Sequence, residues 1–564
     1  GSQAFSMIIS GDISHTVAPV ADFYADNTSP ADNVPVLFTD ASANIPTIWS
    51  WSFSPSTINY ANGTSATSQN PEVEFTANGT YEVSLYAQNA YGNDAETKTG
   101  YITVTDAPSG YCEAYSTHPY GNISRVQFGS IDKTSGYTNV GGADPNDKYY
   151  EDHTAYSTDV TLAGNYNITV TSPNTDVGLD LGIWIDWNRD GDFEDTGEEE
   201  LCGIDNGGEG TFSILVPANA KLGNTRMRLR TKYHGAVCNS CGATLNGEVE
   251  DYTVRVVATW TGITSDWATS TNWNHGEIPT SCHHLVIPTA PSGGNFPDIS
   301  SATDGECNDL KIESSANISI FGSLTVSGTL TNDAGNSGIV VESDASATGS
   351  LIQSTSLVDA TIERYLTQTD YHYISAPVSN QNISTEFVNT GSNPLPTTID
   401  FYKFDEPNNL WRNIKDGSGD LNTGFETQFV VNRGYVYANS NAVYTKNFTG
   451  ELNYAGQTLN LDRTTGTGSE GCNLVGNPFP ASLAANNNAD ADNNFLKDNA
   501  LVLDDSYEAI YYWDSNDYIS INQASAASYI SPIQGFFVKA ATNGAQLEFN
   551  TEIQKHGSAT FYKS

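Results

Sequence analysis

The chain has 564 residues, and 23 Lys and Arg residues against 66 Asp and Glu residues give a formal net charge of −43. Nucleic acids and anionic membrane surfaces are bound through Lys- and Arg-rich surfaces, so this charge excludes both as partners and favours cations. No apolar run is long enough to span a membrane. Because the chain is rich in Gly, Ser, Thr, Asn, Tyr and Val, we expect an all-β protein of about three to five domains.

Residues 12–106 consist of short alternating apolar and polar segments separated by turn residues, which predicts a β-sandwich. Along Tyr81–Ala87 every second residue is apolar. The segments Asn70-Pro-Glu-Val-Glu-Phe75 and Gly79-Thr-Tyr-Glu-Val-Ser-Leu-Tyr-Ala-Gln-Asn89 resemble the PKD domain. This resemblance implies an immunoglobulin-like sandwich that acts as a spacer or binding module in secreted proteins. Residues 1–11 contain no basic region followed by an apolar run, and we expect them to be a linker.

After a linker at Asp106–Gly110, residues 111–257 form the second expected domain. It resembles the GEVED domain of secreted Bacteroidetes proteins, and five segments in the expected order carry the resemblance. They are Tyr111-Cys112, Trp184-Ile-Asp-Trp-Asn-Arg-Asp-Gly-Asp-Phe193, Val216-Pro-Ala218, Thr225-Arg-Met-Arg-Leu229 and Gly247-Glu-Val-Glu-Asp-Tyr-Thr-Val254.

Residues 258–355 contain apolar runs of about three residues separated by Gly, Ser or Asn, such as Leu310–Ile312 and Ile318–Ile320. Strands this short do not form a free-standing sheet, but they are stable when stacked as the rungs of a solenoid. We therefore predict a short β-helix. The segment that opens at Thr259-Trp-Thr-Gly262 also resembles a module found before the sorting signal of Bacteroidetes surface proteins.

Residues 356–564 form the last expected domain. The segments Tyr371-His-Tyr-Ile-Ser-Ala-Pro377, Asn473-Leu-Val-Gly-Asn-Pro-Phe-Pro480 and Gln534-Gly-Phe-Phe-Val-Lys539 resemble the β-sandwich that precedes the sorting domain of type IX secretion. We expect that sorting domain to lie outside this chain. Ala481–Asp498 is the one segment in which we expect a helix, a weak one because it is rich in Asn and Asp.

The acidic segment that begins at Asp186 carries the sharpest chemical signal. Ten acidic residues lie between Asp186 and Glu209, and Arg189 is the one basic residue among them. Oxygen ligands at alternate positions can surround Ca²⁺, and Gly191 permits the sharp bend, as in the first half of an EF-hand loop. The predicted calcium ligands are Asp186, Asn188, Asp190, Asp192, Asp195 and Glu198, with Glu250 from the GEVED segment. The alternative is a solvated acidic turn without an ion.

The carboxylates of the GEVED segment have a second interpretation. Alternation places Glu248 and Glu250 on one face of a strand and Asp251 on the other. In this interpretation the three carboxylates do not bind a metal ion. They form ion pairs with Arg226, Arg228 and Arg230, which also alternate along one strand.

Seven cysteines favour an oxidising, extracellular setting. We expect a Cys282–Cys307 disulfide that contributes roughly 3 kcal/mol. Cys112 and Cys202 are each expected to pair with one cysteine of the C-x-x-C segment at Cys238 and Cys241, which leaves Cys472 as a buried free thiol. A redox or zinc role for the C-x-x-C segment is the alternative.

The sequence contains none of the catalytic motifs H-E-x-x-H, G-x-S-x-G, a P-loop or a dinucleotide fingerprint. Aromatic clusters at Trp260, Trp267 and Trp273 and at Tyr511–Trp513 could stack on sugars or pack in the core. We therefore expect a monomeric, non-catalytic, Ca²⁺-stabilised structural or adhesion region of a cell-surface protein exported across the outer membrane by type IX secretion. Its partners would be calcium and glycans or a cell or host surface. The alternative is the accessory or carbohydrate-binding region of a secreted peptidase or polysaccharide-degrading enzyme.

Overall fold

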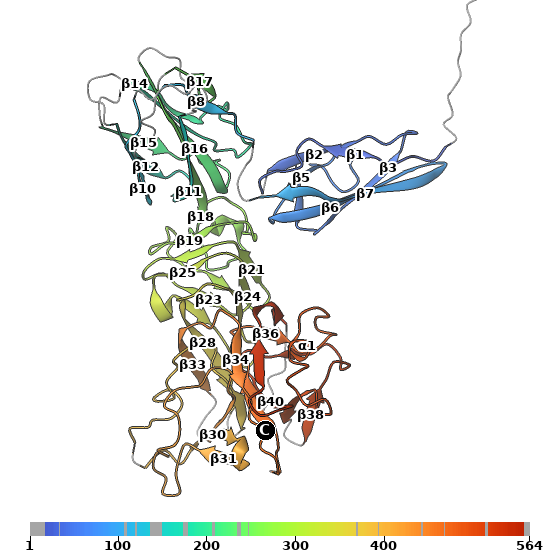
Figure 1. The fold of residues 1–564 in the computed structure, drawn as a ribbon, viewed down its shortest axis with the longest axis vertical. Helices are drawn as coiled ribbons and strands as arrows, with labels where there is room; N and C mark the ends of the chain where they lie inside the picture. Colours follow the sequence, from blue (N-terminus) through green and yellow to red (C-terminus); the bar gives the residue numbers. More distant parts are fainter. Residues whose placement is uncertain are drawn as a thin grey trace, which may run out of the picture. The chain divides into compact units, whose positions relative to one another are not determined.

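The computed structural model describes residues 17–557 except 33, 62, 106–109, 119–120, 136–148, 173–178, 206–208, 234–238, 246, 368–369, 393, 441–443, 467 and 514–516. The expected linkers at 1–11 and Asp106–Gly110 therefore lie wholly or almost wholly outside the described residues. Within the described residues the ordered elements are nearly all strands, and the one α-helix has four residues. The chain divides into two compact units, Gly1–Val257 and Ala258–Ser564. The prediction of an all-β chain is confirmed (Figure 1).

The first part of unit 1 is a sandwich of two antiparallel sheets with the strand orders β1-β2-β5-β4 and β3-β6-β7. Every second side chain of the central strand β6 is buried, among them Tyr81, Val83 and Leu85, and these pack against Trp51 and Phe38 from other strands. This is the alternation that the sequence predicts. The strands are β1 (Phe23–Ala25), β2 (Pro35–Asp40), β3 (Ile48–Ser54), β4 (Ile58–Ala61), β5 (Glu72–Phe75), β6 (Gly79–Asn89) and β7 (Gly92–Val104).

The second part of unit 1 contains two larger sheets. One has the order β10-β9-β12-β15, and the other contains β14-β13-β16-β18, with β11 paired in parallel to β18. The strands are β8 (Ala114–Ser116), β9 (Arg125–Phe128), β10 (Ile131–Thr134), β11 (Tyr150–Thr161), β12 (Asn165–Thr171), β13 (Leu179–Ile185), β14 (Glu199–Asp205), β15 (Glu209–Leu215), β16 (Gly223–Tyr233), β17 (Gly242–Thr244) and β18 (Val249–Thr259). The acidic segment is the loop from β13 to β14.

Unit 2 begins as a β-solenoid. Its short strands stack in parallel in three columns, β19-β22-β25, β20-β23-β26 and β21-β24-β27. Alternate residues such as Leu310 and Ile312 point inward and are buried. The predicted β-helix is therefore present. The strands are β19 (Leu285–Ile287), β20 (Asp298–Ile299), β21 (Asp304–Cys307), β22 (Leu310–Ile312), β23 (Ile318–Ile320), β24 (Ser323–Val326), β25 (Leu330–Asn332), β26 (Ile339–Val341) and β27 (Ser350–Ile352).

The rest of unit 2 consists mainly of small antiparallel sheets. Two of them have the orders β29-β32-β30-β31 and β35-β40-β37-β38. Their strands are β29 (His372–Ile374), β30 (Ile399–Asp405), β31 (Leu410–Asn413), β32 (Tyr435–Asn439), β35 (Cys472–Gly476), β37 (Ile510–Trp513), β38 (Tyr518–Ile521) and β40 (Gly535–Lys539). The other strands are β28 (Asp359–Leu366), β33 (Tyr444–Glu451), β34 (Gln457–Asn460), β36 (Ser482–Ala484), β39 (Tyr529–Ile530), β41 (Gln546–Phe549) and β42 (Gln554–Lys555).

The helix expected over Ala481–Asp498 is wrong for most of its length. The segment begins as strand β36, and α1 covers only Phe495–Asp498. Between them, the Asn486 side-chain amide donates to the Ser525 and Ala526 carbonyls, which fixes a loop rather than a helical turn. Asn side chains compete with the helix for backbone hydrogen bonds, and this explains the difference.

The cysteines follow the prediction in part. Cys112 and Cys241 form a disulfide, which is one of the pairings the sequence left open. Cys202 is also disulfide-bonded, whereas Cys238 lies outside the described residues. The expected Cys282–Cys307 disulfide is wrong, because the Cys307 thiol is free and faces the solenoid interior, where burial raises its pKa. Cys472 has the expected free thiol but is half-buried.

Candidate functional site

The acidic loop between β13 and β14 is anchored at its first residue, Asp186, whose side chain is fully buried. Asp186 Oδ1 accepts a hydrogen bond from the Arg189 backbone N–H at 2.6 Å. Its Oδ2 accepts from the Gly191 N–H at 3.1 Å and from the Tyr111 hydroxyl at 2.7 Å. Gly191 has a φ of 94°, which a glycine adopts easily. Asp186 therefore bends the loop back upon itself.

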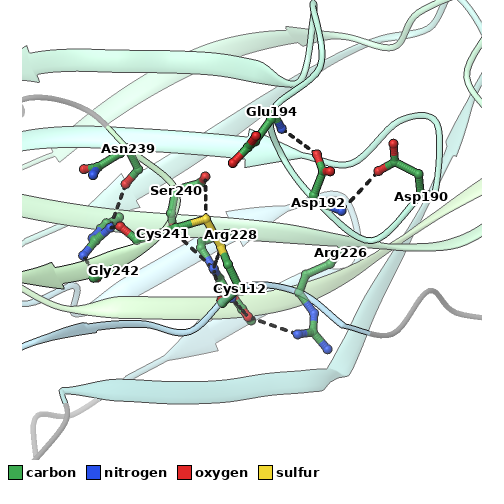
Figure 2. Close-up of a disulfide and its surroundings, with 12 residues drawn as sticks. Cys112, Asp190, Asp192, Glu194, Arg226, Arg228, Asn239, Ser240, Cys241 and Gly242 are labelled. Atoms are coloured by element: carbon green, nitrogen blue, oxygen red, sulfur yellow. Dashed lines mark hydrogen bonds and ion pairs between the residues drawn. A yellow bond between two sulfur atoms is a disulfide. The ribbon is translucent and has the colours of Figure 1, made fainter.

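Three exposed carboxylates gather in this bend. Asp190, Asp192 and Asp195 each have an oxygen within 4.8 Å of the other two. The Asn188 side-chain amide donates to Asp190 Oδ2 at 3.0 Å and to Asp195 Oδ2 at 2.7 Å. Figure 2 shows Asp190 and Asp192 on the same loop, with the Asp192 N–H donating to Asp190 Oδ1 at 3.2 Å. A neutral amide N–H donor thus lies between the carboxylates of Asp190 and Asp195.

Glu198 closes the loop from its far end. Its side chain is 2% exposed, and its oxygens accept long hydrogen bonds from the backbone N–H groups of Asn188 (3.4 Å) and Asp195 (3.3 Å). Burial, together with the charges of Asp186 and Asp190, raises the pKa of Glu198 to about 8. Burial also raises the pKa values of Asp186 and Asp190. Six of the seven predicted calcium ligands therefore belong to one loop that concentrates oxygen atoms and negative charge.

Arg189, the basic residue of the loop, does not neutralise these acids. Its guanidinium is buried, and Nη2 lies 2.6 Å from Oδ1 of the buried Asp32 in the first sandwich. Its Nε donates to the Asn224 carbonyl at 3.0 Å. The positive charge of Arg189 is thus neutralised by Asp32, which lies outside the loop.

The structure places the seventh predicted ligand, Glu250, in a different cluster. Glu250 lies on β18 beside Glu151 of β11, and one ligand atom each from Glu151, His153 and Glu250 falls within 4.8 Å of the others. Neither Glu151 nor His153 was singled out from the sequence. An acid and a histidine two residues apart on one strand, Glu151-Asp-His153, is the signal that could have identified them.

The neighbouring Asp251 points to the opposite face of β18 and pairs with arginine. It accepts a bidentate interaction from Arg228, with Nε–Oδ1 at 2.7 Å and Nη2–Oδ2 at 2.8 Å, and Arg226 Nη1 lies 3.4 Å from Oδ2. Both partners of the Asp251–Arg228 pair are at most 2% exposed. The arginine-pairing interpretation therefore holds for Asp251, whereas the side chain of Glu248 accepts instead from the Ile123 N–H at 2.7 Å.

Arg228 also connects this ion pair to the disulfide. Its Nη1 donates to the carbonyl oxygens of Cys112 at 2.9 Å and Ser240 at 3.1 Å. Figure 2 shows Arg228 beside the Cys112–Cys241 bond. Arg228 therefore has three partners that are distant in sequence, which is why it is a structural rather than a ligand-binding residue.

The two aromatic clusters predicted from the sequence differ in their exposure to solvent. Trp260, Trp267 and Trp273 are buried and pack edge to face, with ring centroids 5.0 and 4.9 Å apart, so they form core and not a sugar platform. Trp513 instead lines a surface hollow of 380 Å³ in unit 2. The lining is almost entirely aromatic: Tyr371, Tyr373, Tyr402, Trp411, Val436, Trp513 and Tyr518.

No helix in the described part of the chain has the length and apolar character needed to cross a membrane. No curated protein matches the chain. Among solved structures, the titin domains z1z2 in complex with telethonin are similar at 10% identity over 43% of this chain and 97% of that chain, with a TM-score of 0.13. A structure of carbohydrate-binding modules from the beta-sandwich superfamily is similar at 14% identity over 36% of this chain and 86% of that chain, also with a TM-score of 0.13. Neither likeness bears on function.

Family models match three parts of the chain. A PKD domain matches residues 16–104 and a GEVED domain matches residues 180–255, in agreement with both resemblances seen in the sequence. A third model, described as a domain of unknown function (DUF8693), matches residues 259–564, which is more than half of the chain. The chain therefore belongs to the DUF8693 family, and in it this domain follows a PKD domain and a GEVED domain.

Proposed function

We propose that this chain is a non-catalytic, structural or adhesive region of an extracellular protein, and that Ca²⁺ bound by the loop 186–198 stabilises its GEVED domain. The observation that carries the proposal is the gathering of Asp190, Asp192 and Asp195, backed by the buried carboxylates of Asp186 and Glu198. Hard cations such as Ca²⁺ take six to eight oxygen ligands of this kind.

Charge balance supports the same proposal. Since Arg189 is paired with Asp32, the loop carboxylates repel one another without an internal counter-charge. A divalent cation removes this repulsion and favours the ionised form of Glu198. Rotation of the Asn188 side-chain amide by half a turn would present its oxygen to the ion in place of the nitrogen. The Asn188 side chain thus donates hydrogen bonds in the metal-free loop, and its oxygen would bind Ca²⁺ in the calcium-bound loop.

Calcium is expected to bind chelator-treated protein and to raise the stability of unit 1. At a free concentration one hundred times the dissociation constant, binding adds about 2.7 kcal/mol to the free energy of unfolding. Isothermal titration calorimetry and thermal unfolding monitored by circular dichroism measure both effects. The double variant Asp190→Asn/Asp192→Asn should lose the binding heat and the thermal shift.

Glu194→Gln is the matched control, because Glu194 is exposed on the same loop and its carboxylate is not among the gathered oxygens. This variant should bind Ca²⁺ as the unmodified protein does. Titration without heat and an unchanged melting temperature would remove calcium from the proposal. Equal loss in the control and the double variant would mean that general loop charge, and not a coordination site, is responsible.

The setting is part of the same proposal. Disulfides such as Cys112–Cys241 persist in oxidising compartments. The motifs in 258–564 that resemble those before type IX sorting domains support export to the surface of a Bacteroidetes cell. The rival function is the accessory region of a secreted peptidase or polysaccharide-degrading enzyme. The full reading frame that encodes this chain decides between them: a catalytic domain elsewhere in it favours the rival, and further β-modules favour a structural or adhesive role.

The aromatic hollow of unit 2 supports glycan binding as a second candidate function. Trp411 and Tyr518 are 42% and 49% exposed, a large fraction for aromatic side chains that pack against other rings. At the rim, the Tyr371 hydroxyl lies 3.2 Å from Asp400 Oδ2, and Lys415 Nζ lies 3.2 Å from Asp400 Oδ1. Flat apolar faces flanked by polar groups suit sugar rings, whose C–H faces are apolar and whose edges carry hydroxyls.

Trp411→Ala is expected to weaken binding of any glycan identified on a glycan array by at least about tenfold, which corresponds to ~1.4 kcal/mol. Tyr91→Ala is the control, since Tyr91 is a similarly exposed aromatic residue in unit 1. Affinity measured by calorimetry should be unchanged in that control. An array without signal for the full chain would rule out this candidate function.

A further inference from the structure

A second cluster of metal-ligand type lies on strands β11 and β18, in the same domain as the acidic loop. The parallel pairing of these strands places Glu151 beside Glu250 and His153 beside Tyr252. His153 Nε2 lies 2.9 Å from Glu151 Oε2 and 3.9 Å from Glu250 Oε1. Two side chains of β11 and one of β18, about 100 positions away in the sequence, therefore bring their polar atoms close together.

The deepest member of the cluster has an unused oxygen. The Ser135 hydroxyl near Glu250 donates its hydrogen bond to the Ile123 carbonyl at 3.1 Å. The Glu250 side chain is 0% exposed, and its Oε1 has no partner that meets hydrogen-bond geometry among the described residues. The same is true of His153 Nε2, because its approach to Glu151 lacks hydrogen-bond geometry. An unpartnered buried oxygen and an unpartnered buried nitrogen are each costly to bury, and one cation between them would satisfy both.

The surroundings hold the two groups in place. The Tyr252 hydroxyl donates to Glu250 Oε2 at 2.8 Å, which leaves Oε1 directed toward His153. The Tyr252 ring also packs against the His153 imidazole with centroids 5.4 Å apart. Metal-ligating carboxylates are commonly oriented by such second hydrogen bonds. Lys133 on β10 is the nearby basic residue, and it also lies over the Tyr156 ring.

We propose that Glu151, His153 and Glu250 bind one divalent first-row transition-metal ion of the Zn²⁺ type, at a site separate from the calcium loop. Imidazole nitrogen combined with carboxylate oxygen selects such ions, whereas Ca²⁺ takes oxygen ligands alone. A tetrahedral ion with bonds of about 2.0–2.1 Å keeps its ligand atoms roughly 3.3 Å apart. The observed separations of 2.9 and 3.9 Å lie on either side of this value. Glu151 is 30% exposed, so solvent reaches the site and supplies the fourth ligand.

The test uses the full chain after chelator treatment, with Zn²⁺ and Co²⁺ as probes. Calorimetry should show one equivalent of tight Zn²⁺ binding, and Co²⁺ should give the intense visible absorption of a four-coordinate ion. Glu250→Gln and His153→Gln should each weaken Zn²⁺ binding by more than about 100-fold, since loss of an outer-shell partner alone costs 10–100-fold. Both variants should retain the far-ultraviolet circular dichroism of the unmodified protein.

Two further variants separate this site from the calcium loop. Asp190→Asn/Asp192→Asn should bind Zn²⁺ normally, and Glu250→Gln should bind Ca²⁺ normally. Zn²⁺ binding that is absent, or that is unchanged in both Glu250→Gln and His153→Gln, overturns the proposal whatever the calcium result. If Glu250→Gln fails to fold, the His153→Gln variant and the Co²⁺ spectrum of the unmodified protein decide.

Discussion

Replacement of Asp251 by alanine is expected to lower the free energy of unfolding of the GEVED domain by about 3–5 kcal/mol. Asp251 is fully buried and is paired through both oxygens with Arg228, which is 2% exposed. Removing the carboxylate leaves the arginine charge in the interior without a counter-charge. Because Arg228 also binds the Cys112 and Ser240 carbonyls, it cannot move to solvent without breaking those hydrogen bonds.

Asp159→Ala is a closely matched control on the same sheet. Asp159 also makes a bidentate interaction with an arginine of β18, Arg255, at 2.7 and 3.0 Å, but the two side chains are 40% and 27% exposed. Exposed pairs contribute about 0–1 kcal/mol. Urea unfolding of both variants measures the difference. Similar decreases in the free energy of unfolding of the two variants would show that burial does not determine how much these ion pairs contribute to stability.

The metal-free protein is expected to lose stability as the pH rises from 5 to 8. Glutamate in the unfolded chain has a pKa of about 4.3. Burial raises the pKa of Glu198 and Glu248 to about 8 and that of Glu250 to about 7. Between these values the folded chain retains protons that the unfolded chain releases. Each group therefore lowers stability by up to about 1.4 kcal/mol per pH unit, an effect absent below pH 4 and complete near pH 8.

Other groups near these glutamates modify the slope. Asp186 and Asp190 adjoin Glu198 and have raised pKa values, so they act in the same direction at lower pH. Burial lowers the pKa of His153, so this one residue favours the folded state as the pH rises through its unfolded value of about 6.5. One histidine cannot offset three glutamates. We therefore expect a net loss of several kcal/mol across this range.

This effect is measured by urea unfolding at pH 5, 6, 7 and 8 in the presence of a chelator, with the free energy taken from the transition of the GEVED domain. The triple variant Glu198→Gln/Glu248→Gln/Glu250→Gln should flatten the profile, because the amides do not titrate. Addition of Ca²⁺ and Zn²⁺ to the unmodified protein should raise stability most at pH 8, where the ligands are ionised. If the free energy of unfolding of the metal-free protein increased with pH, the raised pKa values of Glu198, Glu248 and Glu250 would be contradicted.

The sequence predicts local features of this chain well. Alternation in Tyr81–Ala87 and in runs such as Leu310–Ile312 places the buried side chains correctly, because strand geometry fixes which face each residue occupies. The acidic loop is equally local, since its six predicted ligands lie within thirteen consecutive positions. The structure gathers Asp190, Asp192 and Asp195 as that spacing predicts.

Features that depend on strand pairing could not be predicted. Glu250 faces Glu151 and His153 only because β11 and β18 pair in parallel with that register, and their separation along the chain conceals it. The three buried tryptophans at the start of the solenoid have the same spacing whether they pack inward or face solvent. For Ala481–Asp498, side-chain hydrogen bonds from Asn486 override a weak helical tendency, and this tertiary contact leaves no trace in composition.

The Cys112–Cys241 bond has a mechanical consequence. It joins residues 129 positions apart whose Cα atoms are separated by 5.6 Å. A pulling force applied at the two ends of the chain is transmitted through the sulfur atoms and bypasses the intervening polypeptide. Fully stretched, that polypeptide would supply roughly 440 Å of contour length at ~3.4 Å per residue. The oxidised GEVED domain therefore withholds this length under load. Reduction of its disulfides, including the bond that Cys202 forms, converts a nearly inextensible link into a long tether.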